Sequence, residues 1–210
     1  MLFTTSLTVI GLASGAGSGK IARDLGNEAL TRLSKELGVS LDVVLNSATK
    51  VAKDEYDIST LSDITRHYSE GKLKLSVFVG RVNVVVKSSD EYVQAVAAKY
   101  VGRIAENDVK HILVGEFKPE LGKWVGGHRY GRKSEVEKVG GTFASSNHSE
   151  FPKSWSDEKI LDSVLEVINN SNSAKRNEGK IIIYENTISE IKIRTVYDSI
   201  SQRIITSYPI

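Results

Sequence analysis

The sequence contains no cysteine, and it has only one methionine and three prolines among its 210 residues. Without cysteine, neither a disulfide framework nor a thiolate metal site can form, so the fold cannot depend on the redox state of its surroundings. The excess of positive over negative charge is small as well: the formal net charge is +2, which permits a phosphate-bearing partner without arguing for one. Only four histidines are present, and two of them, His111 and His128, stand about seventeen residues apart beside apolar residues and glycines.

The N-terminal stretch, up to Gly19, lacks charged side chains and long apolar runs. A secretory signal normally begins with a basic segment, which is missing, and the apolar part is too short to span a bilayer. The letters "GAGSGK" resemble a phosphate-binding loop, but that loop needs glycine where Ser14 stands and serine or threonine where Ile21 stands. We therefore expect a loosely packed leader rather than a nucleotide site.

The segment 22–70 has the apolar spacing of helices, in a chain whose 40% apolar and 26% charged residues suit a globular protein with a core. Gly38 is expected to end a first helix, and Ser40 to cap a second. Asp57 or Ser59 is expected to cap a third helix that ends at Gly71. We interpret these residues as a small helical module.

The rest of the chain mixes strand and helix patterns. Alternation of apolar and polar residues predicts strands on both sides of Gly80, over residues 72–90. Helices are expected over 91–107 and over 154–171, the second capped by Ser156, and a polar linker follows. Three strands are then expected over 180–186, 188–198 and 202–210. This order predicts an α+β fold, in which a helical module (1–85) precedes a domain with an antiparallel sheet (86–210).

The two central histidines suit one kind of reaction. Cleavage of an RNA phosphodiester by its own 2′-hydroxyl needs a base for that hydroxyl and an acid for the departing 5′-oxygen, and imidazole can serve as either. A third group, cationic or a strong hydrogen-bond donor, should stabilise charge on the non-bridging oxygens. Such a reaction needs neither a metal nor a cofactor. Taken alone, each residue has a structural alternative: His111 at a strand end, and His128 in a loop after a glycine turn.

The last expected strand carries further polar groups. Because side chains alternate along a strand, Ile204, Thr206 and Tyr208 should share one face, and Ile205 and Ser207 the other. A threonine and a tyrosine side by side suit a core poorly, but they can hold a base and a phosphate. An amphipathic edge strand is the alternative interpretation.

From about residue 108 to the end, the chain resembles the bacterial EndoU-type ribonuclease domain, the C-terminal toxin of contact-dependent inhibition and other polymorphic toxin systems. The matching segments, in the family's order, are "KHILVGE", "GGHRYG", "SEFPKSWSDEKILDSVLEVI", "IKIRTVYD" and "IITSYPI". The resemblance implies a barnase-like fold with a curved antiparallel sheet. It implies that His111 and His128 are the acid–base pair, and that Thr206 and Tyr208 position the substrate. Further substrate contacts are expected from Gly127, Arg129, Lys153 and Ser207.

One position departs from the family pattern. EndoU sites usually carry a lysine as the third catalytic residue, and bacterial members are expected to have it just before the "SEFP" segment. Here that place is occupied by Asn147 and His148. Either His148 takes the third role, or Lys153 or Lys138 reaches into the site instead.

The resemblance implies a toxin endoribonuclease that leaves 2′,3′-cyclic phosphate ends without a metal or a cofactor. Its expected substrate is RNA, with transfer RNA and uridine sites favoured, and its expected partner is an acidic immunity protein. Residues 1–85 would then serve entry, in a protein delivered as part of a larger secreted toxin to the cytoplasm of a target cell. Two alternatives are an RNA-binding module that has lost catalysis, because the lysine is missing, and a structural protein whose histidines are incidental.

Overall fold

The computed structural model describes residues 17–58 and 61–210 of the chain. Contacts between Cα atoms divide the chain into two units, residues 1–95 and 96–210. The expected leader, apart from its last residues, and the alternative cap at Ser59 lie outside the described residues. Among the residues that are described, no helix is both long and apolar enough to cross a membrane.

The first unit is helical, as the apolar spacing of residues 22–70 predicts for that part of it. Its helices are α1 (Gly17–Leu37), α2 (Leu41–Tyr56), α3 (Leu61–Ser69), α4 (Leu75–Lys87) and the greater part of α5 (Asp90–Ala97). The predicted cap of α2 is confirmed, because the Ser40 hydroxyl accepts a hydrogen bond from the Val43 N–H at 3.4 Å. Asp57 ends α2 rather than capping α3, with its backbone in the left-handed region.

The sequence predicts strands over residues 72–90, and this prediction is wrong: the segment forms the helix α4. Phe78, Val82 and Val86 recur every four residues, and all three are buried on one face of that helix. The valines that suggested a strand therefore suit a helix equally well once tertiary packing selects the helical period.

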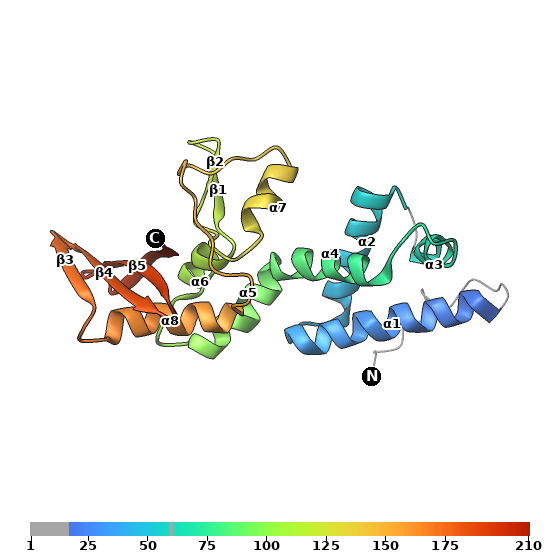
Figure 1. The fold of residues 1–210 in the computed structure, drawn as a ribbon, viewed down its shortest axis with the longest axis horizontal. Coiled ribbons are helices and arrows are strands. Elements are labelled where there is room, and N and C mark those ends of the chain that lie inside the picture. The colour runs from blue at the N-terminus through green and yellow to red at the C-terminus, as the bar shows by residue number, and fades with distance from the viewer. Residues whose placement is uncertain (1–16, 59–60) are drawn as a thin grey trace. The chain divides into compact units, whose positions relative to one another are not determined.

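The second unit combines three α-helices with six strands (Figure 1). After η1 (Ala98–Tyr100), its helices are α6 (Glu106–Leu113), α7 (Arg132–Lys138) and α8 (Asp157–Asn169). Its strands are β1 (Glu116–Lys118), β2 (Lys123–Val125), β3 (Ala174–Glu178), β4 (Ile181–Ile188), β5 (Ile191–Asp198) and β6 (Arg203–Pro209). Strands β1 and β2 form a small hairpin, and β3 to β6 form an antiparallel sheet in chain order.

The core of this unit lies between the four-stranded sheet and its helices. Helix α8 packs against β4 and β5, while α6 packs against β6 (Figure 1). Ser156 caps α8 as predicted, accepting from the Lys159 N–H at 3.1 Å. The buried apolar residues include Ile112, Leu113, Phe151, Ile160, Leu161, Ile193 and Ile204. The α+β fold class predicted from the order of elements is confirmed.

Two boundaries differ from the sequence prediction. The helix expected over 91–107 ends at Ala97, and a new helix, α6, begins at Glu106 and contains His111 in its last turn. The His111 side chain therefore projects from a helix and not from the end of a strand. The polar linker expected at 170–179 contains β3, whose five residues are all exposed, so the sequence offers no apolar alternation there.

A β-bulge changes the faces of β6. Val196 pairs with Thr206 but Tyr197 pairs with Ile204, so Ile205 is an extra residue without a partner on β5. As a result Ile204 and Ser207 are both buried, whereas Ile205 is 42% exposed. The predicted grouping of Ile204 with Thr206 and Tyr208 is therefore wrong, as is that of Ile205 with Ser207, because strict alternation takes no account of a bulge.

Candidate active site

The two central histidines are brought together by backbone pairing between α6 and the loop after β2. Helix α6 ends at Leu113, so its last carbonyls need donors from outside the helix. The loop supplies them: the N–H groups of Gly127 and His128 donate to the carbonyls of His111 and Ile112, both at 2.7 Å. Arg129 donates to Leu113 at 3.4 Å. The loop that carries His128 is thus fixed against the helix that carries His111.

This approach requires the two glycines before His128. Gly126 and Gly127 both have positive φ, +69° and +75°. A Cβ atom at Gly126 would overlap the His111 carbonyl and come within 2.9 Å of Cδ2 and Nε2 of the His111 ring. A Cβ atom at Gly127 would lie 2.7 Å from the Val114 carbonyl oxygen. The glycine pair therefore has a steric purpose, which is to let the loop lie directly against the end of α6 and the His111 ring.

His128 is buried, with 8% of its surface exposed, and its orientation is fixed. Its Nδ1 atom lies 2.8 Å from the Ser149 carbonyl oxygen. Because a carbonyl can only accept, Nδ1 carries the hydrogen and the neutral ring presents the lone pair of Nε2. Burial lowers the pKa of His128 from 6.5 to about 4; the bond to Ser149 opposes this shift, and the positive charges of His148 and His111 add to it.

His111 differs from His128 in having a carboxylate beside it. Its Nδ1 lies 3.5 Å from Oε1 of Glu116, at the start of β1. Burial lowers the pKa of His111, while the hydrogen bond and the charge of Glu116 raise it. Lys118 lies 2.9 Å from the same carboxylate and keeps it ionised by lowering the pKa of Glu116. Glu116 thus fixes the ring and opposes the effect of burial, although the pKa of His111 stays below its ordinary value.

His148 stacks directly on His128. The two ring centroids are 4.8 Å apart with an angle of 17°, and Phe143 covers the other face of His148 at 3.7 Å. The Nε2 atom of His148 lies 3.0 Å from the Gly127 carbonyl oxygen, so it donates and leaves Nδ1 toward the surroundings. Burial lowers the pKa of His148, and the charge of Lys133 lowers it further, against the bond to Gly127 and the charge of Glu150.

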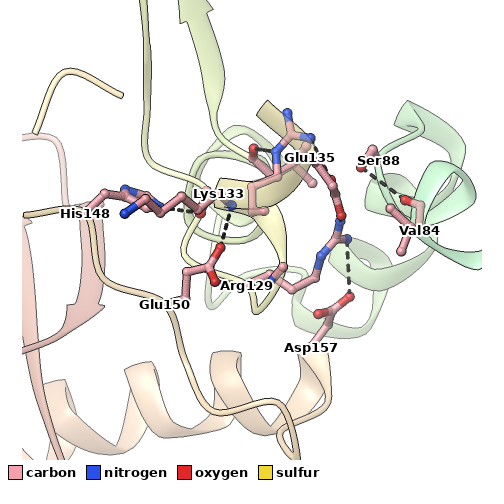
Figure 2. Close-up of polar contacts among 12 residues, drawn as sticks. Val84, Ser88, Arg129, Lys133, Glu135, His148, Glu150 and Asp157 are labelled. Atoms are coloured by element: carbon pink, nitrogen blue, oxygen red, sulfur yellow. Dashed lines mark hydrogen bonds and ion pairs between the residues drawn. The ribbon is translucent and has the colours of Figure 1, made fainter. Parts of the chain in front are cut away.

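Glu150 ties the loop of His148 to the start of α7. Its carboxylate accepts hydrogen bonds from the backbone N–H groups of Gly131, at 3.1 Å, and Lys133 (Figure 2). A carboxylate at a helix N-terminus satisfies donors that have no partner within the helix. The Phe151 N–H also donates to the His128 carbonyl at 2.7 Å. Residues 148–151 are therefore paired along their length with the loop that carries His128.

Tyr208 closes the opposite side of His128. Its ring lies 5.4 Å from that of His128, at an angle of 30°. On the neighbouring strand, Arg194 stands opposite Tyr208 in the register and hydrogen-bonds to it, which raises the pKa of Arg194. Glu185 holds the other side of the Arg194 guanidinium at 2.6 Å. Thr206, one side-chain repeat from Tyr208, is partly exposed on the same face of β6.

The arrangement agrees with a comparison against known protein families. Residues 105–210 match the family described as bacterial EndoU nuclease. The chain belongs to this family. The matched range holds all three histidines of the site and the whole four-stranded sheet. No curated protein and no solved structure matches the chain.

Within this EndoU nuclease domain, the structure corrects two of the predicted substrate contacts. Ser207 is fully buried, and its hydroxyl is 2.8 Å from that of Thr195, so it faces the core and not the site. Arg129 is 5% exposed and forms ion pairs with Glu135 at 3.4 Å and Asp157 at 4.0 Å (Figure 2). Its guanidinium connects α7 with the start of α8, which is a structural task.

The remaining predicted substrate contacts are Gly127 and Lys153, and Lys138 is the other lysine considered for the third catalytic role. Gly127 contributes through its backbone, donating to His111 and accepting from His148. Lys153 lies over the Tyr130 ring, with Nζ 5.9 Å from its centroid, and Lys138 is in the last turn of α7.

A lysine that the sequence reasoning missed stands closer to the histidines. Lys133, in the first turn of α7, acts on the pKa of His148 through its charge. The segment "GGHRYGRK" contains this lysine five residues after His128, whereas the family pattern predicts a lysine further along the chain. Across residues 17–58 and 61–210, no group of three His, Cys, Asp or Glu side chains is placed to hold a metal ion.

Proposed function

We propose that this EndoU nuclease cleaves RNA by transesterification, with His128 as the general base and His111 as the general acid. The observation that carries the proposal is the difference between the two imidazoles. His128 is buried, its pKa is lowered to about 4, and its Nδ1 hydrogen is committed to Ser149. His111 has a carboxylate behind it. Burial lowers the pKa of both rings, but at His111 a carboxylate opposes that shift, whereas at His128 the charges of His148 and His111 add to it.

The first half of the step belongs to His128. Its Nε2 lone pair takes the proton of the ribose 2′-hydroxyl, and the 2′-oxygen forms a bond to phosphorus. Because Nδ1 donates to Ser149 at 2.8 Å, the ring cannot rotate without losing that bond, and the lone pair stays directed at one place. The imidazolium that forms is next to Tyr208, whose ring lies 5.4 Å away and offers its face to the new charge.

The second half belongs to His111. The bond from phosphorus to the 5′-oxygen breaks, and that oxygen takes the Nε2 proton of His111, so the products are a 2′,3′-cyclic phosphate and a free 5′-hydroxyl. Glu116 sits on Nδ1 at 3.5 Å, which leaves Nε2 for the substrate. The missing Cβ at Gly126 leaves room at this edge of the ring, since a Cβ atom would lie 2.9 Å from Nε2.

Lys133 supplies the positive charge that the phosphate needs in the transition state. Its charge reaches His148, which in turn stacks on His128 at 4.8 Å. A preorganised cation at such a place stabilises developing oxygen charge. The lowered pKa of His148 favours its neutral form near pH 7, so His148 acts by supporting the base and by offering Nδ1 to the substrate. Thr206 and Tyr208 hold the ribose and the phosphate.

The second candidate function is an RNA-binding module without catalysis. It is favoured by one observation: a histidine, His148, stands where the family pattern has a lysine. One experiment separates the two functions. The full chain is incubated with total RNA in the presence of EDTA, and the ends of the products are analysed. Cyclic 2′,3′-phosphate ends support the enzyme, while RNA that is bound but intact supports the module.

The biological setting follows from the family resemblance. The RNA that is cut is transfer RNA at a uridine, and the protein acts as a toxin in the cytoplasm of a target cell, to which residues 1–85 help to deliver it. A producing cell then needs a tight inhibitor. An acidic immunity protein that covers His111, His128 and Tyr208 would complement a phosphate-binding site. Expression of the chain with and without a candidate acidic inhibitor, followed by cell counts, tests this setting.

A further inference from the structure

A cavity of about 580 Å³ lies beside His111, between α6 and the turn that joins β5 to β6. Its volume falls within the range of ordinary ligand pockets. The lining includes Asn107, Lys110, His111, Ser201 and Ile205. His128 and Tyr208 do not belong to this lining, so the cavity extends the site on the His111 side only.

The bulge in β6 gives this cavity its apolar wall. Ile205 is the extra residue of the bulge and is 42% exposed, although the isoleucine before it is buried. In a regular strand, Ile205 would pair with a residue of β5 and Thr206 would shift by one position. The bulge therefore turns Ile205 into the cavity, while Thr206 and Tyr208, which follow it in regular register, share a face by ordinary alternation.

The carboxylates of the lining are already paired. Arg203 holds both oxygens of Asp108, one of them at 3.2 Å. Asp198 accepts from the N–H groups of Ile200 and Ser201, at 2.9 and 3.2 Å. Glu116 is held by Lys118. Because a cation or two N–H groups hold each of these carboxylates, and the lining also contains Lys110 and Arg203, a ligand that carries phosphate meets less repulsion here than three unpaired carboxylates would cause.

We propose that this cavity is the subsite for the nucleotide on the 3′ side of the cleaved bond. The proposal rests on the proposed function, in which His111 gives its proton to the 5′-oxygen of that nucleotide. The nucleotide that carries the leaving oxygen must therefore lie on the His111 side, where the cavity is. Ile205 packs against its base or ribose, and the exposed amide of Asn107, which offers donor and acceptor, bonds to the base edge.

Two substrates distinguish an effect on this subsite from an effect on the chemical step. One is the dinucleotide in which uridine is joined through its 3′-phosphate to adenosine. The other is the nitrophenyl ester of uridine 3′-phosphate, which undergoes the same attack by the 2′-hydroxyl but has no nucleotide on the leaving side. The full chain and its variants Ile205→Ala and Asn107→Ala are compared by kcat/KM on both. Ile200→Ala is the matched control, because Ile200 lies in the nearby turn between β5 and β6, is 78% exposed and does not line the cavity.

Ile205→Ala is expected to lower kcat/KM on the dinucleotide by about tenfold more than on the ester, as the loss of one apolar contact. Asn107→Ala should show the same selective loss, and Ile200→Ala should not. Equal losses on both substrates, or none on either, would overturn the subsite. If the unaltered chain cleaved neither substrate, that result would contradict the proposed function itself, and the subsite, which rests on that function, would be overturned too.

Discussion

Gly126→Ala tests how the site is assembled, because it changes a residue that carries no chemistry. Gly126 has a φ of +69°, a conformation that costs an alanine roughly 1–2 kcal/mol. The added Cβ atom would also overlap the His111 carbonyl and lie 2.9 Å from two atoms of the His111 ring. Since that carbonyl is backbone, the loop must move away from α6 to make room.

The size of the effect follows from what that movement breaks. The bonds from Gly127 and His128 to α6, both 2.7 Å, are each worth about 1 kcal/mol net. With the cost of the backbone conformation, the free energy of unfolding should fall by about 3–4 kcal/mol. A displacement on the order of 1 Å between His111 and His128 should also lower the rate by about a hundredfold.

Gly140→Ala is the matched control. Gly140 has a φ of +74°, so the alanine meets the same backbone cost, but nothing lies within 4 Å of its added Cβ. Urea denaturation and kcat/KM on one defined RNA are measured for both variants. Gly140→Ala should lose about 1–2 kcal/mol of stability and keep its activity. If Gly126→Ala were as active as Gly140→Ala, the glycine pair would not be what places the two histidines.

Three further predictions concern charge and metals. The pKa of His128 is lowered from 6.5 to about 4 in the folded chain, so between these pH values the unfolded chain binds more protons than the folded chain. The free energy of unfolding should therefore fall by up to about 3 kcal/mol as the pH drops from 6.5 to 4. Urea denaturation of the unaltered chain and of His128→Gln checks this, and equal pH dependence in both would contradict it. Lys133→Ala should lower kcat by about a hundredfold, and Lys133→Arg should restore part of the lost rate. Lys138→Ala should leave kcat unchanged. A larger loss of kcat in Lys138→Ala than in Lys133→Ala would show that Lys138, and not Lys133, stabilises the phosphate charge. RNA cleavage should survive EDTA, and a complete loss that manganese restores would show that a metal handles the phosphate charge.

Much of the fold follows from local signals that the sequence displays openly. Ser40 and Ser156 cap the helices that their spacing predicts, and the three C-terminal strands follow from alternation and turn residues. The failure at α4 has a physical cause: a run of valines satisfies both the strand and the helix pattern, and only packing against α2 selects between them.

The site was harder to predict, because its geometry depends on long-range contacts. The residue types of His111 and His128 indicate acid–base chemistry, but only the structure shows that Ser149 and Glu116 give the two rings different environments. Arg129 has the charge of a phosphate contact, yet it pairs with two carboxylates, Glu135 in α7 and Asp157 at the start of α8. Neither partner could be inferred from the residues next to Arg129 in the sequence.

The bulge at Ile205 marks another limit of pattern reasoning. Alternation assigns a face to every residue of a strand, and one extra residue reverses the assignment on one side of it. Here the reversal buries Ile204 with Ser207 and exposes Ile205. The same bulge supplies a wall of the proposed subsite, whereas ordinary alternation is what separates Ser207 from Thr206 and Tyr208.

The central claim is that one histidine takes a proton from the RNA and the other returns one. The most direct measurement is kcat/KM on a single defined RNA for His111→Ala and His128→Ala, with His67→Ala in α3 as the control histidine. Each of the first two variants should lose about a hundred- to ten-thousandfold with its fold intact by circular dichroism, while His67→Ala keeps full activity. Near-normal cleavage by either His111→Ala or His128→Ala would contradict the two-histidine mechanism.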